Sequence, residues 1–376
     1  MLLTVKKVLR ALTTSPLSFF RAVWTVASMS QSRSKSRQLI VLNRLPIHES
    51  FTQPLIDALP DDLSLHVVCG YTTETTKSDL SVFQLEPKYE WLLGFLVRRV
   101  IVTPASSVSK SLRGRSNIVA HLTHSLVSLH GVYPDSAFDA FDILFLAGEH
   151  QLNEFEKIGA IRGLERTKAH VTGYPKLDSK FRSEESSAQL GVREVLLAPS
   201  WGAQNILRTS GVEIVKRLRE ADFKVVVRPH PHSYDYDVEV IRQLEVMSAP
   251  DPGLTVESPD FESEAMKSCD VLVSDWSGVA FEFCFTRLRP VVFIDSPRKI
   301  QSVESATINL PYMEEELRTV VGLVSSPSNL TETVLEVCGD VEEFSVQIEA
   351  ESHRYVLNQG NAAAIVKDHL LDLLGS

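Results

Sequence analysis

The chain has 376 residues, of which 44% are hydrophobic and 23% are charged, and this composition excludes fibrous and intrinsically disordered proteins. Its length is sufficient for two domains of ordinary size. With a formal net charge of −10, the protein is not expected to bind nucleic acid. The four cysteines are scattered and form no CxxC pair, which predicts a reducing compartment, unpaired thiols and no metal site.

The first 38 residues differ in charge from the rest of the chain. They contain seven basic residues and no Asp or Glu, whereas the remainder contains 31 basic and 48 acidic residues. Apolar residues recur on both sides of Pro16, in runs far shorter than the roughly 20 residues of a spanning helix. We predict that residues 1–38 form a basic amphipathic segment and linker on an anionic membrane surface, the cytoplasmic face of the inner membrane. A helix packed on the protein's own core and a cleaved leader are the alternatives.

Short apolar runs then alternate with helical stretches, which is typical of an α/β domain with a mostly parallel sheet. The predicted strands are residues 39–43, 65–69, 100–103, 118–121, 143–146 and 170–172. We assign residues 39–185 to a first Rossmann-like domain.

A polar stretch at residues 183–188 predicts an interdomain linker, and the alternation starts again after it. The predicted strands of this second half are residues 195–198, 224–227, 254–256, 271–274 and 291–294. We assign residues 186–328 to a second Rossmann-like domain and residues 329–376 to C-terminal helices that could pack on either domain. The predicted fold class is α/β, with two Rossmann-like domains that face each other across a cleft.

Three histidines lie within ten residues just after the strand at 118–121: His121, His124 and His130. A single histidine is usually structural, but three at the end of a strand favour one catalytic residue. Histidine is the natural group to deprotonate a hydroxyl near neutral pH. No further ligands stand at zinc-site spacing, so no metal is predicted.

Arg228 and His230 end the predicted strand at 224–227, where ligands of open α/β sheets bind. An arginine can pair with phosphate oxygens, and an imidazole can donate to a leaving phosphate. The alternative for Arg228 is a structural salt bridge. Asp235 and Asp237 imitate the DxD element of metal-dependent transferases, but a solvated loop after the His-Pro-His turn is the favoured interpretation.

The run from Ser274 to Glu282 predicts a strand that turns through small residues into a helix, with backbone N–H groups and hydroxyls at the helix N-terminus. Such a turn binds anions, which makes Ser274, Asp275 and Ser277 candidates for a phosphate site. Gly278 would allow close approach of the ligand, and Glu282 could reach a ribose hydroxyl. The alternatives are simple N-capping by the serines and an exposed carboxylate at Glu282. Trp201, after the strand at 195–198, could stack on a base or sugar or cover the core.

Four runs of this chain resemble, in order and spacing, the motifs of the CDP-glycerol glycerophosphotransferase family of wall teichoic acid and capsule synthesis. They are residues 172–178 (T-G-Y-P-K-L-D), 197–201 (L-A-P-S-W), 228–231 (R-P-H-P) and 274–283 (S-D-W-S-G-V-A-F-E-F). The resemblance implies a GT-B architecture, peripheral membrane attachment, no metal or other cofactor, and a cytidine nucleotide donor such as CDP-glycerol on the second domain. It also implies a catalytic base in the first, acceptor-binding domain and a donor-phosphate contact in the second, which correspond to His124 and His230.

The family's first-domain histidine lies in a W-H-G-T-P-like run, whereas this chain has Thr123-His124-Ser125-Leu126-Val127 and a separate His130-Gly131. His121, His124 and His130 therefore all remain candidates for the base, with His124 the expected one. The His-Pro element also resembles bacterial sialyl- and polysialyltransferases that use CMP-sugars. The sequence thus predicts transfer of glycerophosphate or a sugar to a glycan or lipid-linked acceptor, and a non-catalytic nucleotide-sugar-binding protein is the remaining alternative.

Overall fold

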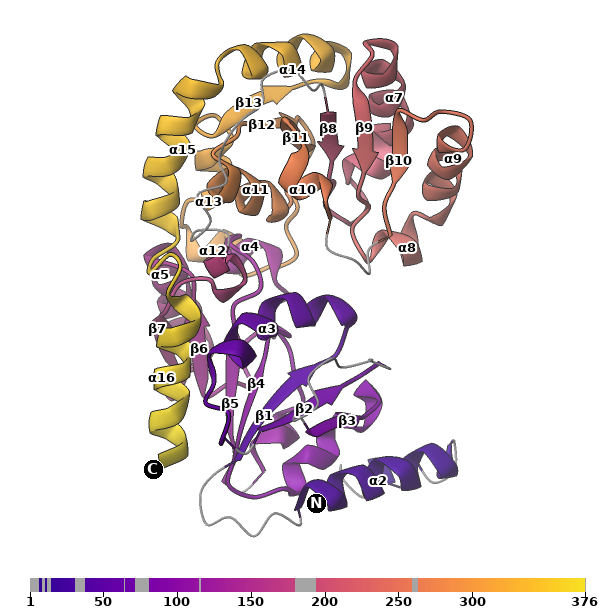
Figure 1. Ribbon diagram of the computed structural model, residues 1–376. Coiled ribbons are helices and arrows are strands. Elements are labelled where there is room, and N and C mark those ends of the chain that lie inside the picture. Colours follow the sequence, from indigo (N-terminus) through magenta and orange to yellow (C-terminus); the bar gives the residue numbers. More distant parts are fainter. Residues whose placement is uncertain are drawn as a thin grey trace.

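The structure is a computed structural model that describes residues 7–8, 11, 15–30, 38–63, 65–71, 81–114, 116–179, 194–258 and 263–375. The predicted interdomain linker at residues 183–188 and most of the N-terminal linker lie outside these residues. Figure 1 shows two α/β domains, one above the other, with the C-terminal helices along one side of both.

The first domain contains a parallel sheet of seven strands in the order β3-β2-β1-β4-β5-β6-β7. The strands are β1 (Gln38–Asn43), β2 (Leu65–Cys69), β3 (Ser81–Gln84), β4 (Arg99–Thr103), β5 (Ile118–Leu122), β6 (Ile143–Leu146) and β7 (Lys168–Val171). Sequence analysis missed only β3 in this sheet, because this short edge strand is half-exposed and has only two apolar residues.

The second domain contains a parallel sheet of six strands in the order β10-β9-β8-β11-β12-β13. The strands are β8 (Glu194–Leu197), β9 (Lys224–Val227), β10 (Leu254–Val256), β11 (Val271–Ser274), β12 (Val291–Ile294) and β13 (Gly322–Ser325). The unpredicted strand β13 begins with a glycine because a Cβ on Gly322 would lie 1.8 Å from the carbonyl oxygen of Val291. Both sheets reverse their strand order as Rossmann sheets do, between β1 and β4 and between β8 and β11, so the predicted α/β fold with two Rossmann-like domains is confirmed.

Helices cover both faces of each sheet, and this explains the almost continuous apolar runs of the strands. In β1, Ile40 and Leu42 face one core cluster whereas Leu39 and Val41 face another. The first domain contains α2 (Pro16–Ser30), η1 (Pro46–His48), α3 (Glu49–Ala58), η2 (Pro87–Phe95), η3 (Lys110–Arg113), α4 (Leu129–Val132), α5 (Glu149–Arg162) and η4 (Pro175–Leu177). The second contains α7 (Ile206–Glu220), α8 (Ser233–Tyr236), α9 (Val238–Ser248), α10 (Ala265–Ser268), α11 (Val279–Arg287), α12 (Ser305–Ile308), α13 (Met313–Leu317) and η5 (Pro327–Asn329).

The C-terminal helices connect the two domains, as Figure 1 shows. Helix α14 (Leu330–Gly339) packs on the second sheet, α15 (Val341–Tyr355) follows it, and α16 (Ala362–Gly375) packs on the first sheet. The Asp178 carboxylate accepts hydrogen bonds from the N–H groups of Ala362 (3.1 Å) and Ala363 (2.7 Å). This buried carboxylate therefore satisfies the N-terminus of α16 and fixes the helix to the first domain.

Helix α2 has two apolar faces. Phe19, one of the residues on the inner face, packs in the core of the first domain with its ring 5.9 Å from that of Tyr89. On the outer face, Leu17, Phe20 and Trp24 are 80%, 61% and 76% exposed. The helix thus packs on its own protein, as one alternative predicted, and still presents apolar side chains to the outside. None of the helices in the described part of the chain has the length and apolar character needed to cross a bilayer.

Candidate functional site

The loops at the carboxyl ends of the two sheets are in contact with each other. Ser125 follows β5 of the first sheet and Gly278 follows β11 of the second, and a Cβ on Gly278 would lie 2.5 Å from the Ser125 hydroxyl oxygen. The close approach that Gly278 permits is therefore an approach of the other domain, whereas ligand contact at Gly278 stays a prediction. Because ligands of open α/β sheets bind at the carboxyl ends of strands, this junction is the candidate site.

His124 lies at the junction, in the loop that follows β5. Its ring is edge-on to the rings of Phe51, His121 and Tyr133, at centroid distances of 5.9, 5.6 and 5.5 Å. Burial lowers the pKa of His124 to about 4, while the Glu282 carboxylate opposes this shift and Lys176 adds to it. The imidazole is therefore neutral at pH 7 and can accept a proton.

The other two candidate histidines are enclosed. His121 is 2% exposed and packs on the rings of Phe138 and Phe141, at 5.1 and 5.3 Å. His130 is 1% exposed, with Nδ1 3.4 Å from a Glu154 carboxylate oxygen. Of the three, only His124 is partly exposed, so the geometry supports the choice that the sequence left open.

In the second domain, Arg228 and His230 follow β9 as expected. The Arg228 guanidinium lies 3.3 Å from the Glu257 carboxylate, so the salt bridge considered as its alternative role is present. The Nδ1 atom of His230 accepts a hydrogen bond from the His232 N–H at 3.1 Å. Burial, Lys299 and His232 together lower the pKa of His230 to about 3. The neutral ring therefore carries its proton on Nε2, from which it can donate to a phosphate oxygen.

Ser274 and Asp275 are buried and bonded within the protein. The Ser274 hydroxyl donates to the Ala198 carbonyl at 2.6 Å. The Asp275 carboxylate accepts from the N–H and hydroxyl of Ser200, at 2.6 and 2.9 Å, and from the Ile206 N–H at 3.1 Å. These two side chains shape the loop after β8 at the point where the second sheet reverses its strand order. Their direct contact with a donor stays a prediction.

Ser277 and Glu282 belong to the turn and first helical turn of α11. Ser277 is 9% exposed, and neither it nor any other side chain caps α11, so simple N-capping does not explain the serines. Glu282 is 6% exposed and accepts from the Tyr174 hydroxyl and from Lys176 Nζ, both at 2.6 Å. The alternative of an exposed carboxylate is therefore wrong: Glu282 joins the second domain to the first. A contact with ribose stays a prediction.

Trp201 is partly exposed and lies in a group of basic and aromatic side chains. The Nζ atom of Lys299 is 3.7 Å from the Trp201 ring centroid, and the His232 ring is 4.7 Å away. Burial lowers the pKa of Lys299 to about 7. Sequence analysis missed Lys299, although the basic pair Arg298-Lys299, four residues after the end of a buried strand, was a usable signal.

The DxD-like pair separates in the structure. Asp235 is exposed, but Asp237 is 4% exposed, lies 2.6 Å from Arg208 and accepts from Asn205 at 3.1 Å. The predicted solvated loop is thus wrong for Asp237, because this carboxylate compensates a guanidinium at the start of α7. Across the described ranges, no three His, Cys, Asp or Glu side chains gather in a way that could hold a metal.

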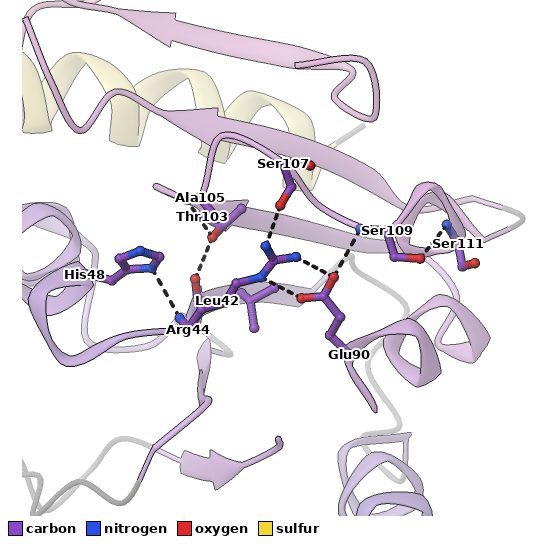
Figure 2. A network of polar contacts seen from close by, with 9 residues as sticks. All are labelled: Leu42, Arg44, His48, Glu90, Thr103, Ala105, Ser107, Ser109 and Ser111. Atoms are coloured by element: carbon purple, nitrogen blue, oxygen red, sulfur yellow. Dashed lines mark hydrogen bonds and ion pairs between the residues drawn. The ribbon is translucent and has the colours of Figure 1, made fainter. Parts of the chain in front are cut away.

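The first sheet has its own polar network where β1 and β4 diverge (Figure 2). Arg44 donates two hydrogen bonds to the Glu90 carboxylate, at 2.7 and 2.5 Å, and a further one to the Ser107 carbonyl. The N–H of Arg44 donates to Nδ1 of His48 at 3.2 Å. Sequence analysis missed this network because its members come from distant parts of the chain.

Two Rossmann-like domains whose carboxyl edges meet, one with a neutral histidine and the other with basic side chains, define a GT-B-type architecture. Solved structures agree with this class. The chain is similar to the wall teichoic acid polymerase TagF (TM-score 0.63, 14% identity, covering 100% of this chain and 98% of that chain). It is also similar to Staphylococcus aureus MnaA with UDP (0.59, 13%, 90% and 98%) and to Methanocaldococcus jannaschii UDP-GlcNAc 2-epimerase (0.53, 13%, 89% and 99%). At these identities the likeness shows the fold alone.

The family resemblance inferred from the four motifs is confirmed. Residues 137–315 match the family described as CDP-Glycerol:Poly(glycerophosphate) glycerophosphotransferase, and the enzyme is a transferase. The matched segment contains all four motifs and begins after His124, so the predicted base lies outside it. A comparison with curated proteins gave no match.

Proposed function

We propose that the enzyme transfers glycerophosphate from CDP-glycerol to a hydroxyl group of a glycan or lipid-linked acceptor in the synthesis of a cell-surface polymer. The family match supports the donor and the transferred group. The observation that carries the proposal is the contact between the loop of His124 and the turn before α11, because it joins a proton acceptor to the predicted phosphate site. The donor occupies the second domain and the acceptor occupies the first.

The proposed reaction is an in-line displacement at phosphorus. The acceptor hydroxyl gives its proton to His124, and its oxygen attacks the β-phosphorus of CDP-glycerol. The bond from that phosphorus to the bridging oxygen breaks, and CMP leaves with the electron pair. Arg228, the Nε2–H of His230 and the N-terminal turn of α11 stabilise the charge that develops on CMP.

The electrostatics of the site are consistent with this division of roles. A base with a pKa of about 4 is weak, but the negative charge of a bound diphosphate would raise the pKa of His124 toward neutrality. The same negative charge would raise the pKa of Lys299 from about 7, so that the ammonium form binds the donor. Donor binding thus prepares both groups for their roles.

We further propose that α2 attaches the enzyme to the cytoplasmic surface of the membrane. Leu17, Phe20 and Trp24 form an exposed apolar face, and Arg21 beside them is also exposed. Apolar side chains with a basic neighbour suit the interface of an anionic bilayer. Monomeric soluble proteins rarely expose a large apolar patch unless it binds a partner or a membrane.

The donor is tested by calorimetric titration of the full chain with CDP-glycerol, a CMP-sugar and UDP-GlcNAc, followed by measurement of CMP release with a synthetic oligo(glycerol phosphate) acceptor. We expect tightest binding of CDP-glycerol and CMP release that depends on the acceptor. Preference for the CMP-sugar would replace glycerophosphate transfer by sugar transfer in the same site. Binding without turnover would support a non-catalytic nucleotide-binding protein and contradict the proposal.

A further inference from the structure

A fourth histidine, His48, lies at the carboxyl edge of the first sheet. It ends η1, five residues after β1, at the point where the order of the first sheet reverses between β1 and β4. Ligands of Rossmann-like sheets bind at such reversal points. His48 is 9% exposed and has no role in the chemistry described above.

The orientation of the His48 ring is fixed by the chain around it. Its Nδ1 atom accepts the hydrogen bond from the Arg44 N–H, and Figure 2 shows the other ring nitrogen directed away from Arg44. A neutral imidazole whose Nδ1 accepts carries its proton on Nε2. Burial, followed by the neighbouring His124 and Arg44, lowers the pKa of His48 to about 3, so the ring is neutral at pH 7. His48 therefore presents a fixed N–H donor.

The loop that holds His48 is itself well supported. Asn43 donates to the Thr52 hydroxyl at 3.1 Å, which connects the end of β1 to α3. The Arg44 guanidinium is compensated by Glu90, whose carboxylate also accepts the Ser109 N–H at 3.1 Å. A donor on such a loop keeps its position when a ligand binds, which is what binding of a specific oxygen requires.

His48 and His124 belong to one cluster. His124 lowers the pKa of His48, and His48 in turn lowers the pKa of His121, so the three rings lie close to one another. Phe51, three residues after His48, places its ring 5.9 Å from that of His124. The η1–α3 segment thus brings a fixed N–H donor close to the proposed base, on the side of the first domain.

We propose that His48 is an acceptor-binding residue whose Nε2–H donates to an oxygen of the terminal glycerol phosphate unit, next to the hydroxyl that His124 deprotonates. This inference rests on the proposed function and adds to it a residue that sets the position of the acceptor. His48 donates a hydrogen bond and transfers no proton, because its Nδ1 lone pair is already used by Arg44.

Two substitutions distinguish the roles of the two ring nitrogens of His48. In His48→Asn, the side-chain oxygen replaces Nδ1 as acceptor for the Arg44 N–H, but the Nε2–H is lost. In His48→Ala, both groups are lost. His66→Asn is the control, because His66 is a half-buried histidine of β2 in the same sheet, away from the carboxyl edge.

The experiment measures acceptor KM and kcat with CDP-glycerol and oligo(glycerol phosphate), and donor Kd by calorimetry. We expect both His48 variants to raise acceptor KM by about tenfold to a hundredfold, the effect of one hydrogen bond to a charged group, with donor Kd unchanged. Wild-type acceptor KM in His48→Asn would overturn the inference and leave His48 as a structural cap. If the wild-type enzyme does not turn over this pair of substrates, the proposed function fails and the inference fails with it.

Discussion

The two sheets share one topology, yet their reversal points carry different chemistry. At the first, the His48, His121 and His124 rings are neutral and the Arg44 charge is compensated by Glu90. At the second, Lys299 and His232 lie against the Trp201 ring, and the Arg318 guanidinium lies 4.1 Å from the ring centroid of Trp276 in the turn before α11. The edge with little net charge suits a hydroxyl-bearing acceptor, and the basic edge suits a diphosphate. The same topology thus carries different side chains at its two reversal points, and the proposed division of the reaction depends on that difference.

The largest effect is expected at the neutral edge. His124→Ala should lower turnover by about 10²–10⁴-fold, the usual cost of losing a general base. His121→Ala and His130→Ala, assayed beside it for CMP release after a check of folding, should retain much more activity. A dead His130→Ala together with a normal His124→Ala would place the base six residues further along the chain.

The neutrality of the histidines should also appear in the pH dependence of stability. Between pH 6.5 and about 4 the unfolded chain binds protons on His48, His124 and His230, whereas their lowered pKa values keep the folded rings neutral. Acidification therefore favours unfolding, by about 1.4 kcal/mol per pH unit for each ring. Urea unfolding at pH 7, 6 and 5 measures the dependence of the unfolding free energy on pH. His48→Asn should remove the contribution of one ring from this dependence. Equal stability at the three pH values would show that the rings do not stay neutral.

The junction between the two edges depends on Lys176 and Glu282. Lys176→Met should destabilise the protein by about 3 kcal/mol, because it leaves the buried Glu282 carboxylate without its cation. The matched control is Lys88→Met, which removes an exposed lysine paired with Glu86 and should leave urea unfolding unchanged. Similar behaviour of the two variants would mean that the buried pair does not hold the domains together.

The smallest effect concerns the proposed attachment of α2 to the membrane. Replacing Leu17, Phe20 and Trp24 together with serine should weaken binding to phosphatidylserine vesicles at least about tenfold while nucleotide binding is retained. These substitutions leave the inner face of α2 packed in the core of the first domain. Deletion of the whole helix would remove that packing as well. Val246→Ser, an exposed apolar residue of the second domain, is the control in vesicle flotation. Undiminished flotation of the triple variant would contradict attachment through α2.

Much of the fold was predictable because buried parallel strands are short apolar runs between helices. The runs of β1 and β11 are examples, whereas β3 is a half-exposed edge strand with only two apolar residues. Strand β13 was missed although the apolar run at residues 320–324 contains it. The positions of His124 and Arg228 at the carboxyl edges of the sheets could be predicted because a strand end precedes each of them. The position of the turn around Ser274 could be predicted for the same reason, because it follows the apolar run of β11.

Contacts between residues that are far apart in the sequence could not be predicted. Glu282 is one turn into a helix, and nothing nearby in the chain indicates that Tyr174 and Lys176 will neutralise it from the other domain. Nothing near Asp275 in the chain likewise indicates that its carboxylate will accept a hydrogen bond from the Ser200 hydroxyl. His48 lies in a loop without a recognisable motif, and its position beside His124 depends on the order of the strands in the sheet.

The division between the two edges is tested most directly by calorimetric titration of CDP-glycerol into the wild-type enzyme, His124→Ala and Arg228→Ala. We expect Arg228→Ala to weaken donor binding by about 1.5–3 kcal/mol, the usual contribution of a hydrogen bond to a charged group, and His124→Ala to leave the Kd within about twofold. Unchanged affinity in Arg228→Ala with weakened affinity in His124→Ala would place the donor on the first domain and contradict the account.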